Sequence, residues 1–312
     1  MGISSSRIMK GPNLFLLGAA KSGTTALSGF LGEHPNIYIG YPKEPSYWSF
    51  DISSSNSVCK IDSLSEYLSV YEGSSGERYI LDASTSYLYS REAVTNIVNF
   101  CREAKFIVVI RDLVEMAHAY HMEKVFNASE DEEDFEKAWH LQYERLRGRN
   151  IPKRCAEPAE LQYKAIVSVG TQLERVLSVV ADSSVLICFH DDFKNDPRAF
   201  WGEIMSFLQI EDAERTDYPT VGGAHYNRFQ RLAFFYQQPP HAIAPVIYKI
   251  KKFFRNNVFG RTVWGALRGV IISTGERVPL DADFKNYLRG ELEPEVEKIE
   301  RITGRDLSHW KV

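Results

Sequence analysis

Residues 18–25, with the sequence GAAKSGTT, place a lysine, three hydroxyl side chains and two glycines between an apolar run and a helical pattern. A strand, a turn of small residues and a helix N-terminus direct several backbone N–H groups and the positive end of the helix dipole at one point. Gly18 and Gly23 allow the tight turn, Lys21 adds a mobile positive charge, and hydroxyl donors come from Ser22, Thr24 and Thr25. The pattern predicts a phosphate-binding loop. The alternative is an ordinary strand-to-helix connection with Thr24 as N-cap.

The order of residues in this loop differs from that of ATP-binding loops. Their signature, G-x-x-x-x-G-K-[ST], has the lysine after the second glycine, whereas Lys21 here precedes Gly23. In those proteins a second strand ends at an Asp that organises magnesium, whereas the comparable run, AKFIVVIRD, reaches Arg111 before Asp112. A cation at this edge favours a second phosphate over a metal ion.

The elements that must hold these residues alternate along the chain. Short apolar runs rich in β-branched and aromatic residues occur at 14–18, 36–40, 78–83, 105–112 and 184–192. Helical patterns occur at 24–33, 90–103, 113–127, 134–147, 160–181 and 197–209. This alternation predicts a three-layer α/β/α fold with a central parallel sheet. We expect one domain over 1–312, with 45–75 and 215–275 as acceptor-site loops or a lid.

Composition excludes several classes of protein. A formal net charge of −4 provides no global basic field, so no nucleic-acid partner is expected. The four cysteines form no CxxC pair, which argues against a zinc cluster and indicates a reducing, cytoplasmic location. No apolar stretch approaches the roughly 20 residues of a membrane span. The acidic segment 129–139 is interpreted as the solvated start of a helix, not as a metal site. The oligomeric state is not readable.

The motifs together resemble those of the sulfotransferases that use 3′-phosphoadenylyl sulfate (PAPS), and most closely the glycan-modifying and bacterial branch. The resemblance extends in order over nearly the whole chain, through AAKSGTT (19–25), HPNIYIGYPKEPSYW (34–48), LDASTSYLY (81–89), RDLVEMAHA (111–119), LICFHDDFKNDP (186–197) and VEKIERITGRDLSHW (296–310). It implies a P-loop sulfotransferase fold, PAPS as co-substrate, 3′,5′-adenosine bisphosphate (PAP) as product and no metal.

The resemblance also implies a set of donor-binding residues. The 5′-phosphosulfate would be held by Ala20, Lys21, Ser22, Gly23, Thr24 and Thr25. The 3′-phosphate would be held by Arg111, by the position of Ala119 and by Arg277 in a GER segment. Ala119 stands where the family has a serine, so one hydroxyl contact is missing. We therefore expect either weaker binding of the donor or a 3′-phosphate that is held by cationic side chains from other parts of the chain.

Two residues are expected to carry the chemistry. Lys21 would stabilise the leaving phosphate, and Glu44 in PKEPSYW would be the general base, with Lys43 holding it ionised or binding an anionic acceptor. The alternative for Glu44 is a surface carboxylate paired with a lysine. Other candidate bases are His34, His118 and His121. Weaker candidates for acceptor contacts are Asp82, Tyr47 and Trp48, although Asp82 could be a turn carboxylate and the aromatics could be core.

Three functions follow from these observations. The first is transfer of a sulfuryl group from PAPS to a hydroxyl or amine of a saccharide or small-molecule acceptor. The second is a nucleotide kinase or NTPase with a degenerate loop, which the position of Lys21 and the Arg111 strand disfavour. The third is a nucleotide-binding protein on the same scaffold without turnover.

Overall fold

The computed structural model of the 312-residue chain describes residues 11–52, 61–213, 215, 217–218, 224–227, 272–275 and 279–312. The chain divides into two compact units. The first consists of Met1–Ala117, Lys164–Gly222 and Lys285–Val312, and the second of His118–Tyr163 and Gly223–Phe284.

A parallel sheet of five strands forms the centre of the first unit, in the order β2-β3-β1-β4-β5. The strands are β1 (Leu14–Gly18), β2 (Ile37–Ile39), β3 (Tyr79–Asp82), β4 (Lys105–Ile110) and β5 (Val185–Phe189). Every residue of β1 is buried. Such continuous burial explains why the strands read as unbroken apolar runs. All five coincide with the runs expected from the sequence, and their carboxyl ends share one edge.

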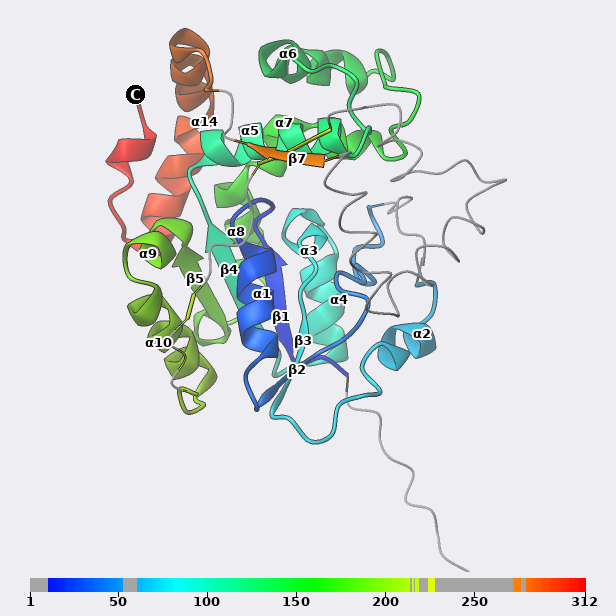
Figure 1. Ribbon diagram of the computed structural model, residues 1–312, viewed down its shortest axis with the longest axis vertical. Coiled ribbons are helices and arrows are strands. Elements are labelled where there is room, and N and C mark those ends of the chain that lie inside the picture. The colour runs from blue at the N-terminus through cyan, green and yellow to red at the C-terminus, as the bar shows by residue number, and fades with distance from the viewer. Residues whose placement is uncertain are drawn as a thin grey trace, which may run out of the picture. The chain divides into compact units, whose positions relative to one another are not determined.

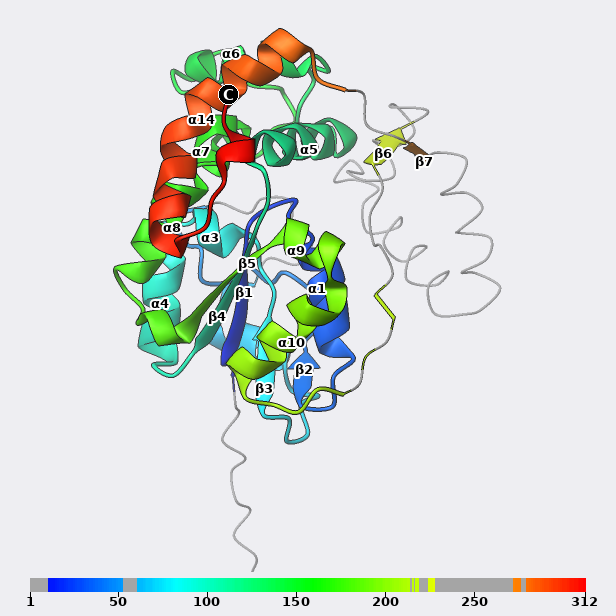
Figure 2. The ribbon, with the colours of Figure 1, turned by 90° about the vertical axis from the view of Figure 1, so that its left-hand side faces the viewer.

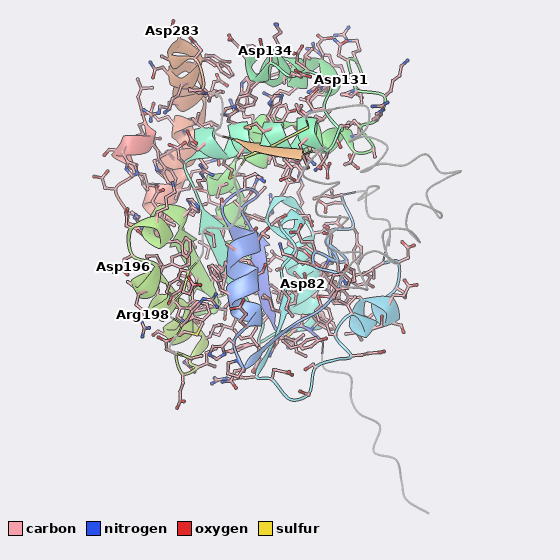
Figure 3. All side chains as sticks on the ribbon, in the orientation of Figure 1. Asp82, Asp131, Asp134, Asp196, Arg198 and Asp283 are labelled. Carbon is pink, nitrogen blue, oxygen red and sulfur yellow. The ribbon has the colours of Figure 1, made fainter. Side chains whose placement is uncertain are left out.

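Helices α1 (Thr24–Gly32) and α10 (Pro197–Leu208) cover one face of this sheet (Figure 1). Leu14, Leu81 and Ile107 from three strands join Phe30 of α1 and Trp201 of α10 in one buried cluster. Asp196, labelled in Figure 3, caps α10 by accepting a hydrogen bond from the Ala199 amide at 2.9 Å. Packing on this face thus fixes α1, the helix that follows the turn after β1.

The opposite face carries α3 (Ser86–Tyr89), α4 (Ala93–Phe100) and α8 (Val169–Leu177), as Figure 2 shows. Helices thus lie on both sides of a parallel sheet, which confirms the expected α/β/α architecture. The C-terminal helix α14 (Ala282–Thr303) lies against α8 at Gly170, where a Cβ atom would lie 2.5 Å from the Glu295 carbonyl oxygen. The first unit also contains the short helices α2 (Leu64–Ser69) and α9 (His190–Asn195).

The second unit contains α6 (Phe135–Arg145), the later part of α5 (Leu113–Phe126) and the antiparallel pair β6 (Ala224–Asn227) and β7 (Ile272–Gly275). The helix expected at 160–181 is divided into a 3₁₀ turn (Pro158–Leu161), α7 (Tyr163–Ile166) and α8.

The acidic segment before α6 is solvated only in part. Asp134 caps α6 by accepting from the Lys137 amide at 3.2 Å. Glu130, however, is fully buried and forms an ion pair with Arg145 at 2.6 Å, and it also accepts from the Tyr163 hydroxyl at 2.5 Å.

Two kinds of feature are absent from the residues that the structure describes. No helix among them is long and apolar enough to cross a membrane. They also contain no group of three or more His, Cys, Asp or Glu side chains that could hold a metal ion.

Candidate active site

The loop at 18–25 connects β1 to α1 at the carboxyl edge of the sheet. Gly18 (φ 147°), Lys21 (φ 62°) and Gly23 (φ 90°) all have positive φ, and two of these positions are glycines, which adopt such angles without steric cost. The Ala19 amide donates to the Val109 carbonyl at 2.7 Å, which ties the start of the loop to β4. The chain therefore turns sharply before the helix begins.

The first turn of α1 has no side-chain cap. Gly23 occupies the N-cap position, so no side chain caps the helix, and no acidic residue lies in its first turn. Thr24 therefore does not cap the helix, unlike in the ordinary strand-to-helix connection considered above. Uncapped first-turn amides and the positive end of the dipole favour an anion there. Of the neighbouring hydroxyl residues, Ser22 and Thr24 are buried, whereas Thr25 is exposed.

A second loop brings Lys43 and Glu44 to the phosphate loop. Lys43 Nζ lies 2.7 Å from Glu44 Oε1 and donates to Thr25 Oγ1 at 3.3 Å. The other carboxylate oxygen of Glu44 accepts from the Thr85 hydroxyl at 3.5 Å. Glu44 remains partly exposed, with 40% of its side-chain surface accessible. The structure thus joins two segments of the predicted site, and the carboxylate remains accessible to a substrate.

Asp82, labelled in Figure 3, is the last residue of β3. It is completely buried. Its oxygens accept hydrogen bonds from Ser84 at 2.6 Å, from Tyr67 at 2.7 Å and from Tyr87 at 2.8 Å. Burial raises the pKa of Asp82 to about 6, although these hydroxyls oppose the shift. Hydroxyl donors thus enclose the carboxylate, and the expectation that Asp82 faces the acceptor stays a prediction.

The aromatic residues expected at the acceptor site differ in exposure. Trp48 is buried and packs against Tyr67 and Phe100, with ring centroids 5.3 Å and 4.9 Å away. It belongs to the core, and its assignment as an acceptor contact stays a prediction. Tyr47 is half-buried and stacks on Tyr67 at 4.8 Å, while Phe50 is 59% exposed.

Arg111 follows β4 as the sequence indicates. Its guanidinium Nη2 lies 3.2 Å from Glu115 Oε2, one turn further along the start of α5. Asp112, the residue that a magnesium-binding site would need here, instead accepts from the Glu115 amide at 2.9 Å. Burial raises the pKa of Asp112. Asp112 thus serves as a helix cap.

The remaining donor-site predictions lie elsewhere in the chain. Ala119 is buried in α5 and lacks the hydroxyl that the resemblance would place there. Arg277 and most of 215–275 lie outside the described residues, and so do residues 53–60 of the other expected loop.

The three histidines that were alternative candidate bases all contact other parts of the protein. The Asn36 amide donates to Nδ1 of His34, so Nε2 carries the proton and donates to the Glu211 carbonyl at 2.9 Å. His121 Nε2 lies 2.8 Å from the Glu132 carbonyl, and burial lowers the pKa of this imidazole. His118 stacks on Phe135 at 5.5 Å. Both ring nitrogens of His34 are thus used in hydrogen bonds.

One neighbour of the phosphate loop was missed by sequence reasoning. His190 begins α9 directly after β5, and a Cβ atom added at Gly23 would lie 3.2 Å from its Cδ2. The HDDF segment enters the sequence interpretation only through the family resemblance. Its position at the end of the fifth strand was the signal that could have indicated this proximity.

Comparisons with known proteins agree on one family. The family model described as "Sulfotransferase domain" matches residues 11–219. Among curated relatives, bifunctional heparan sulfate N-deacetylase/N-sulfotransferase 4 of Mus musculus is 22% identical over 72% of this chain, and bifunctional heparan sulfate N-deacetylase/N-sulfotransferase 3 of Homo sapiens is 23% identical over 72%. Each match covers 24% of the relative, so the chain spans about a quarter of the length of these proteins.

A solved structure shows the same fold. The chain superposes on a sulfotransferase from Alicyclobacillus acidocaldarius with a TM-score of 0.70 and 21% identity, covering 96% of this chain and 99% of the other.

Proposed function

The chain belongs to the sulfotransferase family, and on that premise we propose that it moves a sulfuryl group from PAPS to a hydroxyl or amine of a saccharide or small-molecule acceptor. Sulfuryl transfer as the reaction class comes with the family. PAPS as donor, the acceptor class and the residue roles are the proposed part. The observation that carries them is the contact of Lys43 with both Thr25 and Glu44, because it brings an anion-binding loop and an accessible carboxylate together.

The donor would bind with its 5′-phosphosulfate over the loop at 18–25. The uncapped amides of α1 and the side chain of Lys21 would face the phosphate oxygens. During an in-line displacement the acceptor atom forms a bond to sulfur while the bond from sulfur to the bridging oxygen breaks. That electron pair goes to the 5′-phosphate of PAP, where Lys21 and the amides stabilise the growing charge.

The proton of the acceptor must go to a base within hydrogen-bond reach. Glu44 is proposed for this role because its carboxylate is exposed and is held by Lys43 and Thr85 beside the loop. Lys43 would hold Glu44 ionised or bind an anionic acceptor. The names of the curated relatives support a glycan acceptor, and Tyr47 and Phe50 offer ring faces near Glu44 in the chain.

Ligand binding tests the donor assignment. We expect PAP to raise the thermal stability of the protein, while ATP and GTP with magnesium do not. At 100 times its dissociation constant a ligand stabilises the fold by about 2.7 kcal/mol. Lys21→Ala should abolish most PAP binding in calorimetry, whereas Lys137→Ala, which removes an exposed lysine on α6, should not. Tighter binding of a triphosphate would instead favour the kinase interpretation.

Turnover tests the base assignment. Glu44→Gln should keep PAP binding and lower kcat by a factor of roughly 10² to 10⁴, as loss of a general base does. If only KM rose, Glu44 would be a binding residue. If PAP bound but no acceptor in a screen with labelled donor were sulfated, the non-catalytic interpretation would be favoured.

A further inference from the structure

A buried relay of hydrogen bonds connects Asp82 to the loop that carries Glu44. The Ser84 hydroxyl donates to Asp82 Oδ1 at 2.6 Å, and the hydroxyl oxygen of Ser84 accepts from the Ser46 amide at 3.0 Å. Ser84 and Asp82 have no exposed surface. Ser46 is two residues from Glu44, so the relay ends on the backbone beside the candidate base.

The loop needs such support because its backbone is unfavourable. Glu44 has a φ of 59° and Ser46 a φ of 52°, which are left-handed conformations that side-chain-bearing residues seldom adopt. Conformations of this kind persist only when the surroundings impose them. The Ser46 side chain accepts from the Ser86 hydroxyl at 3.1 Å, and its carbonyl accepts from the Ser49 hydroxyl at 2.9 Å. These contacts and the Ser84 contact together surround one residue of the loop.

We propose that Asp82 is a positioning residue which, acting through Ser84, holds the Glu44 loop in the geometry needed for proton removal from the acceptor. This inference rests on the proposed function of Glu44. Asp82 does not touch the substrate in this scheme. It fixes the direction of the Ser84 hydroxyl, because an ionised carboxylate only accepts hydrogen bonds and so leaves the Ser84 oxygen free to accept from the Ser46 amide.

The relay depends on the ionisation of Asp82. Its carboxylate accepts from three hydroxyls, those of Ser84, Tyr67 and Tyr87. A protonated carboxyl group must itself donate one hydrogen bond, so one of these donors would lose its acceptor. The titratable groups that face Asp82 are Tyr67, Tyr71 and Tyr87, and burial raises the pKa of each phenol, so they stay neutral. Asp82, whose pKa burial raises to about 6, therefore sets the pH range of the relay.

Amide hydrogen exchange at Ser46 tests the relay without requiring turnover. In Ser84→Ala the Ser46 amide loses its acceptor, and at about pH 8 we expect its exchange to accelerate about 3- to 10-fold, the range for loss of one hydrogen bond. Tyr87→Phe is the matched control, because it removes one hydroxyl from Asp82 and leaves the Ser84 arm intact. In the wild type the exchange rate, corrected for the intrinsic effect of pH, should rise below about pH 6. In Ser84→Ala the corrected rate should stay flat.

Kinetics then separate this inference from the proposed function. Ser84→Ala should lower kcat about 10-fold and leave PAP affinity unchanged, while Tyr87→Phe should change neither beyond about 2-fold. Unchanged exchange in Ser84→Ala would overturn the inference. Faster exchange with normal kcat, in an enzyme that Glu44→Gln inactivates, would also overturn it. If Glu44→Gln were fully active, the base assignment would fail, and the exchange result alone would decide whether Ser84 holds the loop.

Discussion

Lys43 donates from Nζ to Oγ1 of Thr25 across 3.3 Å, which ties the loop of the candidate base to the first turn of the helix behind the phosphate loop. The two residues are 18 positions apart in the sequence. Lys43, the residue before Glu44, is therefore connected to the first turn of α1.

The contribution of Lys43 can be measured with Lys43→Met. The ion pair with Glu44 is partly exposed, with 28% and 40% of the two side chains accessible. Such pairs contribute up to about 1 kcal/mol, so we expect turnover to fall about 2- to 5-fold in steady-state assays. Lys137→Met on the exposed face of α6 is the control. A loss above about 100-fold would mean that Lys43 contacts the reacting group directly.

The conformation of Gly23 should be needed for the phosphate loop. Its φ of 90° strains any residue with a side chain, and a Cβ atom would lie 3.2 Å from His190 Cδ2. Gly23→Ala should lower stability by about 1 kcal/mol or more and weaken PAP binding in calorimetry. The control is Gly29→Ala within the same helix, where a Cβ atom meets nothing within 4 Å. This control should raise stability by about 0.5–1 kcal/mol. Equal effects of the two changes would contradict the prediction.

Asp82 should make stability fall as the pH rises. Its pKa is about 6 in the folded protein and 3.8 ordinarily, so the folded state binds more protons between these values. The stabilising contribution of the protonated form is complete below about pH 4 and is lost by about pH 6, an effect of at most about 3 kcal/mol.

Urea unfolding at about pH 4.5 and about pH 7 measures this term. Relative to Asp82→Asn, which cannot ionise, the wild type should lose stability between the two conditions. Tyr87→Phe removes a hydrogen bond that favours the carboxylate, so it should extend the loss to higher pH. A difference between wild type and Asp82→Asn that does not change with pH would contradict the assigned pKa.

The buried pair of Glu130 and Arg145 should be essential to the second unit. The two side chains are 0% and 1% exposed, and Arg145 donates to both oxygens of Glu130, at 2.6 Å and 2.7 Å. Arg145→Ala would leave an uncompensated buried carboxylate, at a cost of about 3–5 kcal/mol in the free energy of unfolding. Arg147→Ala, which removes a 68% exposed partner of Glu144, should cost under about 1 kcal/mol. A loss below about 1 kcal/mol in Arg145→Ala would mean that the region relaxes around Glu130.

Two features could be read from the order of residues alone, namely the sheet and the turn between β1 and α1. Strands buried on both faces must be continuous apolar runs, so β1 to β5 could be read directly, and the loop residues are contiguous between β1 and α1. The order of Lys21 and Gly23 and the position of Arg111 after β4 are likewise local features. Glu44 could be predicted as the base only from the resemblance of its motif, because the residues next to it in the sequence do not show what its side chain faces.

The burial of polar side chains and their contacts became evident in the three-dimensional fold. In the sequence, Asp82 and Glu130 cannot be distinguished from acidic residues that are exposed to solvent. In the structure, hydroxyls of α2, α3 and Ser84 enclose Asp82, and Arg145 pairs with Glu130. Trp48 likewise lies in the core because it packs against the rings of Tyr67 and Phe100, which are distant from it in the sequence. Burial and hydrogen-bond partners depend on residues distant in sequence, and no local pattern of residue types records which distant segments meet.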